Sequence, residues 1–121
     1  MSDIEMPGIL EFIKTETMSK GRVKTTLMLF LLDIATFHDI CARYLRGEIT
    51  TLEVRVGTVI KHPKDKYDKK IAKAEAAKRL KKHKYVISSL YTQGGKTTLT
   101  VHEDGHSVEV VCDGKGMRIY V

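Results

Sequence analysis

The chain has few cysteines, which excludes a scaffold held together by disulfides. Cys41 and Cys112 are its only thiols, whereas small secreted domains that depend on disulfides carry more. The stretch Met1-Ser2-Asp3-Ile4-Glu5 is acidic and does not read as a secretory signal peptide. We therefore expect a soluble protein of the reducing cytoplasm.

Long apolar runs are also missing. The longest is Leu27-Met28-Leu29-Phe30-Leu31-Leu32, which Asp33 interrupts. A helix needs about 20 apolar residues to span a bilayer, so this run is too short. We interpret it as part of a buried helix or of a contact between subunits, and we expect no membrane partner.

A recognisable catalytic constellation is absent too. Nucleophilic catalysis requires a cysteine or serine beside a base. Cys41 lies on the apolar stripe of an expected helix, and Cys112 alternates with Val108 and Val110, so both thiols are predicted to be core residues. We expect a non-enzymatic protein with no cofactor and no metal. An active site assembled from residues far apart in the sequence remains the alternative.

Two short motifs resemble functional sites but lack required parts. Residues 94–98, Gly-Gly-Lys-Thr-Thr, resemble the end of a phosphate-binding P-loop, but Leu90 occupies the position of its first glycine and strand residues follow. Residues 102–106, His-Glu-Asp-Gly-His, offer imidazoles and carboxylates without the ligand spacing of a zinc site. Hairpin turns explain both motifs more simply.

Positive charge is concentrated in one segment. The chain has a formal net charge of +6, yet residues 61–84 alone hold eleven basic and three acidic side chains, a balance of +8. The other residues hold ten basic and twelve acidic side chains, or −2. This asymmetry favours an anionic partner and rapid electrostatic capture.

Length and composition predict one folded domain over residues 1–121. The chain is 42% hydrophobic and 30% charged, which is ordinary for a globular protein and unlike a disordered chain. Pro7-Gly8 breaks any long helix near the start, and residues 1–22 support no assignment.

Residues 24–46 predict a helix, because apolar residues such as Leu27, Ile34, Phe37 and Cys41 recur at spacings of three and four. Gly47 then provides a residue that can end it. The first half is apolar on all sides, so a sheet or another subunit should cover it. We expect a homo-oligomer that associates through this helix.

Residues 49–60 alternate as in a half-buried strand, and residues 66–82 predict a second helix. Asp65 or Asp68 can cap this helix. Its expected inner stripe is Tyr67, Ile71 and Ala74. A separate lysine face, predicted to bind phosphate, comprises Lys66, Lys69, Lys70, Lys73 and Lys81.

Four short strands follow, over residues 85–92, 97–102, 107–112 and 116–121, separated by glycine-containing hairpin turns. The resulting fold class is α+β, with an antiparallel meander sheet of about five strands and two helices packed on one face.

A second anion site is predicted on the sheet. Arg55, Tyr91 and Arg118 alternate with core residues and are expected to face outward, and Lys61 follows at a strand end. Arginine and tyrosine on an exposed sheet can hold a phosphate and stack on a ring. The alternative is ordinary cross-strand pairing of Arg118 with Glu53 or Glu109.

Residues 57–68, Gly-Thr-Val-Ile-Lys-His-Pro-Lys-Asp-Lys-Tyr-Asp, followed by Ala72, Ala76 and Arg79-Leu80, resemble a pattern in small bacteriophage proteins. There a strand ends in Cys or His, then Pro, Asp and an aromatic, before a helix with Ala and Arg. The resemblance implies a phage accessory protein acting in the host cytoplasm. Such proteins include non-enzymatic sponges of the Thoeris anti-defence type, which sequester nucleotide signals.

Three functions are compatible with these features. The leading hypothesis is an oligomer that captures a phosphate-bearing nucleotide without turnover, using Arg55, Lys61, Tyr91, Arg118 and the lysine face. The first alternative is a small protein that places residues 66–84 on a nucleic-acid backbone. The second is an inhibitor that docks on an acidic protein surface.

Overall fold

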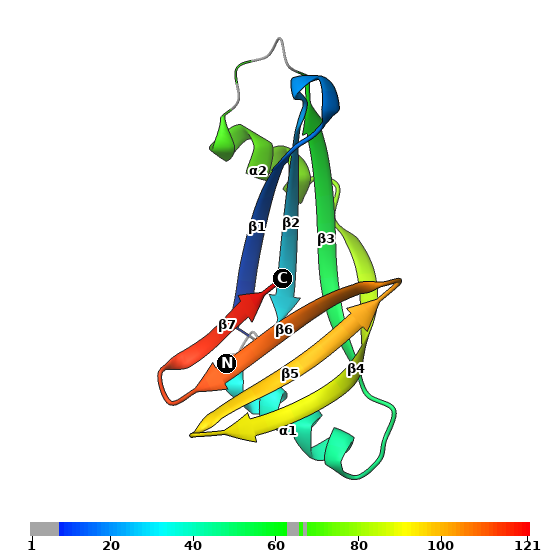
Figure 1. Cartoon of the computed structure of the whole chain (residues 1–121), viewed down its shortest axis with the longest axis vertical. Coiled ribbons are helices and arrows are strands. Elements are labelled where there is room, and N and C mark those ends of the chain that lie inside the picture. The colour runs from blue at the N-terminus through cyan, green and yellow to red at the C-terminus, as the bar shows by residue number, and fades with distance from the viewer. Residues whose placement is uncertain (1–7, 63–65, 67) are drawn as a thin grey trace, which may run out of the picture. The chain divides into compact units, whose positions relative to one another are not determined.

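In the described residues the fold consists of a seven-stranded sheet, two α-helices and a short 3-10 helix. The computed structural model describes residues 8–62, 66 and 68–121, and Figure 1 shows the chain. Neighbouring strands are hydrogen-bonded in the order of the sequence, and the three pairings from β4 to β7 are antiparallel. The elements are β1 (Ile9–Thr17), the 3-10 helix η1 (Ser19–Gly21), β2 (Val23–Leu31), α1 (Ile34–Leu45), β3 (Thr51–Lys61), α2 (Lys69–Ala77), β4 (Lys81–Gln93), β5 (Lys96–Glu103), β6 (His106–Asp113) and β7 (Gly116–Tyr120).

The α+β class and the antiparallel sheet are confirmed, but five strands is wrong. β1 lies in the region that supported no assignment, and β2 replaces the first half of the predicted 24–46 helix. Thr25, Leu27 and Phe30 of β2 are buried. A run that is apolar on both faces suits a strand covered on both sides as well as it suits a buried helix.

The remaining half of that predicted helix is α1. Asp33 caps it by accepting a hydrogen bond of 2.7 Å from the Thr36 amide, and this bond lowers the pKa of the Asp33 carboxyl. Gly47, with a φ of 81°, follows its C-terminal end as expected. The proposed association through a 24–46 helix therefore loses its structural basis, and oligomerisation itself stays a prediction. No helix in the described part of the chain is long and apolar enough to cross a membrane.

The chain forms two compact units, each built from separated segments. The α1 unit comprises residues 8–10, 30–53 and 84–121, and the α2 unit comprises residues 11–29 and 54–83 apart from 63–65 and 67. Their boundaries fall inside β1, β2, β3 and β4, so each of these strands contributes to both units. A single domain over residues 1–121 stays a prediction.

The α1 unit has its core between α1 and the inner face of β4–β7. Leu99 of β5 and Val110 of β6 are opposite each other and fully buried, as is Phe37 of α1. Burial, and then the nearby Cys112 thiol, raise the pKa of Cys41. Both cysteines are buried and reduced, which confirms their expected place in the core.

Glycine-containing turns connect the strands of the α1 unit, as expected. Gly94 and Gly95 have φ of 60° and 76° between the paired residues Gln93 and Lys96. A two-residue hairpin turn of this type needs positive φ at both central residues, and glycine adopts positive φ without strain, so this sequence favours a tight hairpin. The stretch that resembles a P-loop is therefore a turn leading into β5.

In the α2 unit, α2 packs on the sheet through small residues. Ala72 and Ala76 are buried, and the backbone carbonyl of Ala76 lies against Gly57 of β3. The predicted inner stripe is wrong, because Ile71 is 55% exposed and Ala74 is also exposed. A helix that approaches a strand this closely needs alanine at the contact. Tyr67 lies outside the described residues.

α2 is also shorter than the predicted 66–82. Asp68 caps it by accepting hydrogen bonds from the amides of Lys70 (2.9 Å) and Ile71 (3.3 Å), which confirms one of the two expected caps. Asp65 lies outside the described residues. The helix ends at Ala77, and β4 begins at Lys81. The last predicted helical residues therefore form a turn and the start of a strand.

Candidate nucleic-acid interface

Positive charge separates by unit. Among its described residues, the α2 unit holds fourteen basic and four acidic side chains, a formal charge of +10. The described part of the α1 unit holds six basic and eight acidic side chains, or −2. Apart from Lys84, the described charged residues of 61–84 are thus part of a larger cationic unit that also includes most of β1, η1 and most of β2.

Each described acidic side chain of the α2 unit is already engaged. Glu11 pairs with Lys73, Glu16 with Lys14 and Glu75 with Lys78. The fourth, Asp68, caps α2. No described acidic side chain of this unit is therefore uncommitted, and the described basic side chains outnumber the acidic ones by ten.

The predicted lysine face is divided between several elements. Lys69 and Lys70 are exposed in the first turn of α2, and Lys66 is exposed before it. Lys73 is half-buried in its ion pair with Glu11, which joins α2 to β1. Lys81 is the first residue of β4, so its predicted place on the helix is wrong. Figure 1 shows α2 beside the strands of its own unit.

Arg55 and Lys61 lie on β3 within the α2 unit. Arg55 was expected to face outward, but it is half-buried, and its Nε atom is shielded from solvent without a hydrogen-bond partner in the structure. Residues two apart on a strand share a face, so Arg55 shares one with Gly57, which α2 covers. Lys61 is half-buried at the end of the strand.

Tyr91 and Arg118 lie on the outer face of the α1 unit, as expected. Strand register places Tyr91 opposite Thr98, Thr98 opposite Val111, and Val111 opposite Arg118. The four residues form one row across β4–β7. Arg118 makes no ion pair with any described residue, so pairing with Glu53 or Glu109 does not occupy its guanidinium.

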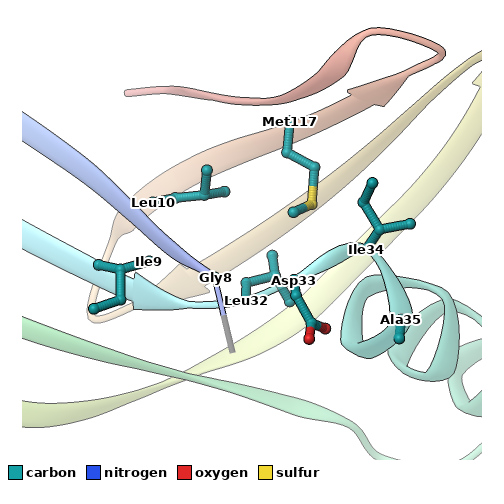
Figure 2. Close-up of a pocket in the computed structure, with 8 residues that line it drawn as sticks. All are labelled: Gly8, Ile9, Leu10, Leu32, Asp33, Ile34, Ala35 and Met117. Carbon is teal, nitrogen blue, oxygen red and sulfur yellow. The ribbon is translucent and has the colours of Figure 1, made fainter. Parts of the chain in front are cut away.

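A shallow apolar hollow of about 420 Å³ lies in the α1 unit. Figure 2 shows Leu10 of β1, Ile34 of α1 and Met117 of β7 around it. Among the described residues that line it, Asp33 alone is charged, and in Figure 2 its carboxylate points away from Met117. Apolar walls and a carboxylate do not suit a phosphate.

No metal site is found in the described residues, and the two thiols are not exposed. No group of three or more His, Cys, Asp or Glu residues among them is arranged to hold a metal ion. His102 and His106 flank the β5–β6 turn. Cys41 and Cys112 are buried.

Several basic residues of the α2 unit were not among the predicted site residues. Lys20 of η1, Arg22 between η1 and β2, and Lys24 of β2 belong to this unit although they are far from residues 61–84 in the sequence. The sequence does indicate a second basic cluster, because four of the basic residues outside 61–84 fall within residues 14–24. Without β1 and β2, that cluster could not be assigned to the same unit.

No family model matches the chain, and no curated protein or solved structure matches it either. Its function is therefore inferred from the chemistry of its own residues.

Proposed function

We propose that the α2 unit binds the phosphate backbone of nucleic acid. The observation that carries the proposal is its charge of +10 together with the engagement of all four described acidic side chains. Charge distributed over β1, η1, β2, β3 and α2 suits an extended polyanion better than one small phosphate. Lysine contacts to phosphate supply most of non-specific nucleic-acid affinity.

Lys69 and Lys70 support the proposal by their position. They occupy the first turn of α2, which contains no acidic residue. The N-terminal end of a helix carries a partial positive charge that disfavours cations. Residues that contradict a local preference without an evident structural gain are often retained for function. The Asp68 carboxylate offsets part of this repulsion, and a bound phosphate would offset more of it.

Binding of this kind is salt-dependent and weakly sequence-specific. Lysine is a flexible point charge, whereas reading base edges relies on the bidentate geometry of arginine, asparagine or glutamine. The exposed cations of α2 are lysines, and Arg55 is half-buried. We therefore expect DNA and RNA of unrelated sequence to bind with similar affinity.

Capture of a phosphate-bearing nucleotide is a second candidate, in line with the resemblance to phage anti-defence proteins. The exposed ring of Tyr91 and the exposed guanidinium of Arg118 are the groups that could each contact such a ligand. A thermal-shift screen of cyclic and linear nucleotides tests it, since a ligand that binds only the folded state raises the unfolding temperature as its concentration exceeds Kd.

The proposed function is tested by charge reversal on α2. Fluorescence anisotropy with a labelled duplex, over a range of salt concentrations, gives the affinity and its salt slope. We expect Lys69→Glu with Lys70→Glu to weaken binding and to reduce the magnitude of the slope by about 1.8, because each lost phosphate contact removes about 0.9.

The matched control reverses two exposed lysines of the α1 unit, Lys96→Glu with Lys115→Glu, for the same change in net charge. This control should retain most of the affinity. Equal losses in both double variants would mean that only net charge matters, and unchanged binding by the α2 variant would contradict the proposal.

A further inference from the structure

The outer face of β4–β7 carries two exposed aromatic rings. Beside the Tyr91–Arg118 row, a second row places Ser89 opposite Thr100, Thr100 opposite Glu109, and Glu109 opposite Tyr120. Tyr91 is 59% exposed and Tyr120 is 49% exposed. Both rings are therefore open to a ligand on the side of the sheet opposite the core.

The positions of the side chains around these rings are set by the pairing of the strands. The Tyr91 hydroxyl donates to the side-chain carbonyl of Gln93, two residues along the same strand and on the same face. Val111, between Thr98 and Arg118 in its row, is only 8% exposed although it lies on this face. Val111 is therefore covered by its neighbours, and the rows present the tyrosine rings and a guanidinium around it.

The dimensions of the face favour a chain of nucleotides over one nucleotide. Neighbouring strands lie about 4.8 Å apart, so Tyr91 on β4 and Arg118 on β7 are separated by about 14 Å across the sheet. A base stacked on Tyr91 does not reach Arg118. Phosphates further along the same nucleic-acid chain do reach Arg118. Its guanidinium is available to them because it makes no ion pair with a described residue.

We propose that this face, comprising Tyr91, Thr98, Val111, Arg118 and Tyr120, binds single-stranded nucleic acid. Unpaired bases stack on Tyr91 and Tyr120, and Arg118 contacts a phosphate between them. Stacking requires the face of a base, which a duplex keeps within its own stack. Glu109, opposite Tyr120, repels phosphate and can instead accept a hydrogen bond from a base amino group.

This inference rests on the proposed function and adds strand selectivity to it. The α2 unit attracts any phosphate backbone, whereas the tyrosine face distinguishes unpaired from paired bases. The α2 unit and the tyrosine face predict different effects of substitution on single-strand and duplex binding. Either proposal can therefore be contradicted without the other.

The test compares a labelled single strand of about 12 nucleotides, within the range of a sheet-borne site, with a duplex of the same sequence. We expect Tyr91→Ala to weaken single-strand binding about 10-fold, with a similar effect of Tyr120→Ala, and to change duplex binding less than about 2-fold. Tyr91→Phe keeps the ring and should retain single-strand affinity. Thermal unfolding confirms that each variant is folded.

The outcomes separate the two proposals. If Tyr91→Ala and Tyr120→Ala bind the single strand like wild type, while Lys69→Glu with Lys70→Glu weakens both probes, the tyrosine face is overturned and the proposed function stands. If only the tyrosine variants weaken binding, the face is supported and the role of the α2 unit is overturned. Competition by a mononucleotide at concentrations equal to those of the oligonucleotide overturns the chain-binding inference and supports nucleotide capture.

Discussion

The backbone carbonyl of Ala76 in α2 occupies the space that a Cβ atom on Gly57 of β3 would need. Its carbonyl carbon would lie 2.9 Å from that Cβ, with a methyl carbon of Leu80 at 3.3 Å. The contact is with backbone, so it cannot be relieved by rotating a side chain. Glycine at this position lets α2, which carries Lys69 and Lys70, pack directly on the strand.

Gly57→Ala should therefore displace α2 and lower the free energy of unfolding by about 1–3 kcal/mol, as overpacking does elsewhere. Urea denaturation measures this change. Gly114→Ala is the matched control, because a Cβ there meets no atom within 4 Å. If both variants have the stability of wild type, α2 does not pack on Gly57 as described.

Lys70→Glu should separate stability from binding. A carboxylate in the first turn of α2 interacts favourably with the helix dipole, so we expect the free energy of unfolding to rise by about 0.3–1 kcal/mol at low salt. Nucleic-acid affinity should fall in the same variant. Stability is measured by thermal unfolding and affinity by anisotropy.

Lys78→Glu is the counterpart of Lys70→Glu at the C-terminal end of α2, where Lys78 pairs with Glu75. There a negative charge opposes the dipole and repels Glu75, so stability should fall. A loss of stability in Lys70→Glu would show that the first-turn lysines serve the helix, and would remove one argument for their role in binding.

Asp33 should make the stability of α1 depend on pH in the acidic range. Its pKa lies below the ordinary value of 3.8, because the Thr36 amide hydrogen-bonds the charged carboxylate. A pKa that is lower in the folded state gives stability that is present above 3.8 and lost as the pH falls through the folded value. Thermal unfolding between pH 7 and about 2 follows this loss.

Asp33→Asn is the control, since asparagine also caps helices but does not titrate in this range. The variant should lose less stability than wild type on acidification below 3.8. Parallel acid profiles for the two proteins would contradict a contribution of the ionised Asp33 to the cap.

Much of the α1 unit was predictable because its turns are specified locally. Gly94-Gly95 and Asp104-Gly105 give two-residue hairpins, and such turns determine which residues of the flanking strands pair. Counting outward from these turns places Tyr91 opposite Thr98 and Thr98 opposite Val111. The Tyr91–Arg118 row was therefore encoded in the sequence, although only its two ends were predicted as site residues.

The α2 unit was less predictable because its contacts join distant segments. The apolar run containing Leu27 and Phe30 suits a helix or a strand equally well when its periodicity alone is considered. The stripe of α2 was assigned to Ile71 on hydrophobicity, whereas the approach to Gly57 selects Ala72 and Ala76. Neither the strand conformation of β2 nor the alanine contact of α2 can be derived until it is known that β1, β2 and β3 pair.

By the proposed function, the α2 unit is the surface that binds the nucleic-acid backbone. Titrating isotope-labelled protein with a short duplex, and following backbone amide chemical shifts by NMR, tests it most directly. We predict that salt-sensitive shift changes concentrate at Lys20–Lys24 and Lys66–Lys73, with small changes on the outer face of β4–β7. Changes confined to the α1 unit, or none at a duplex concentration well above that of the protein, would contradict the claim.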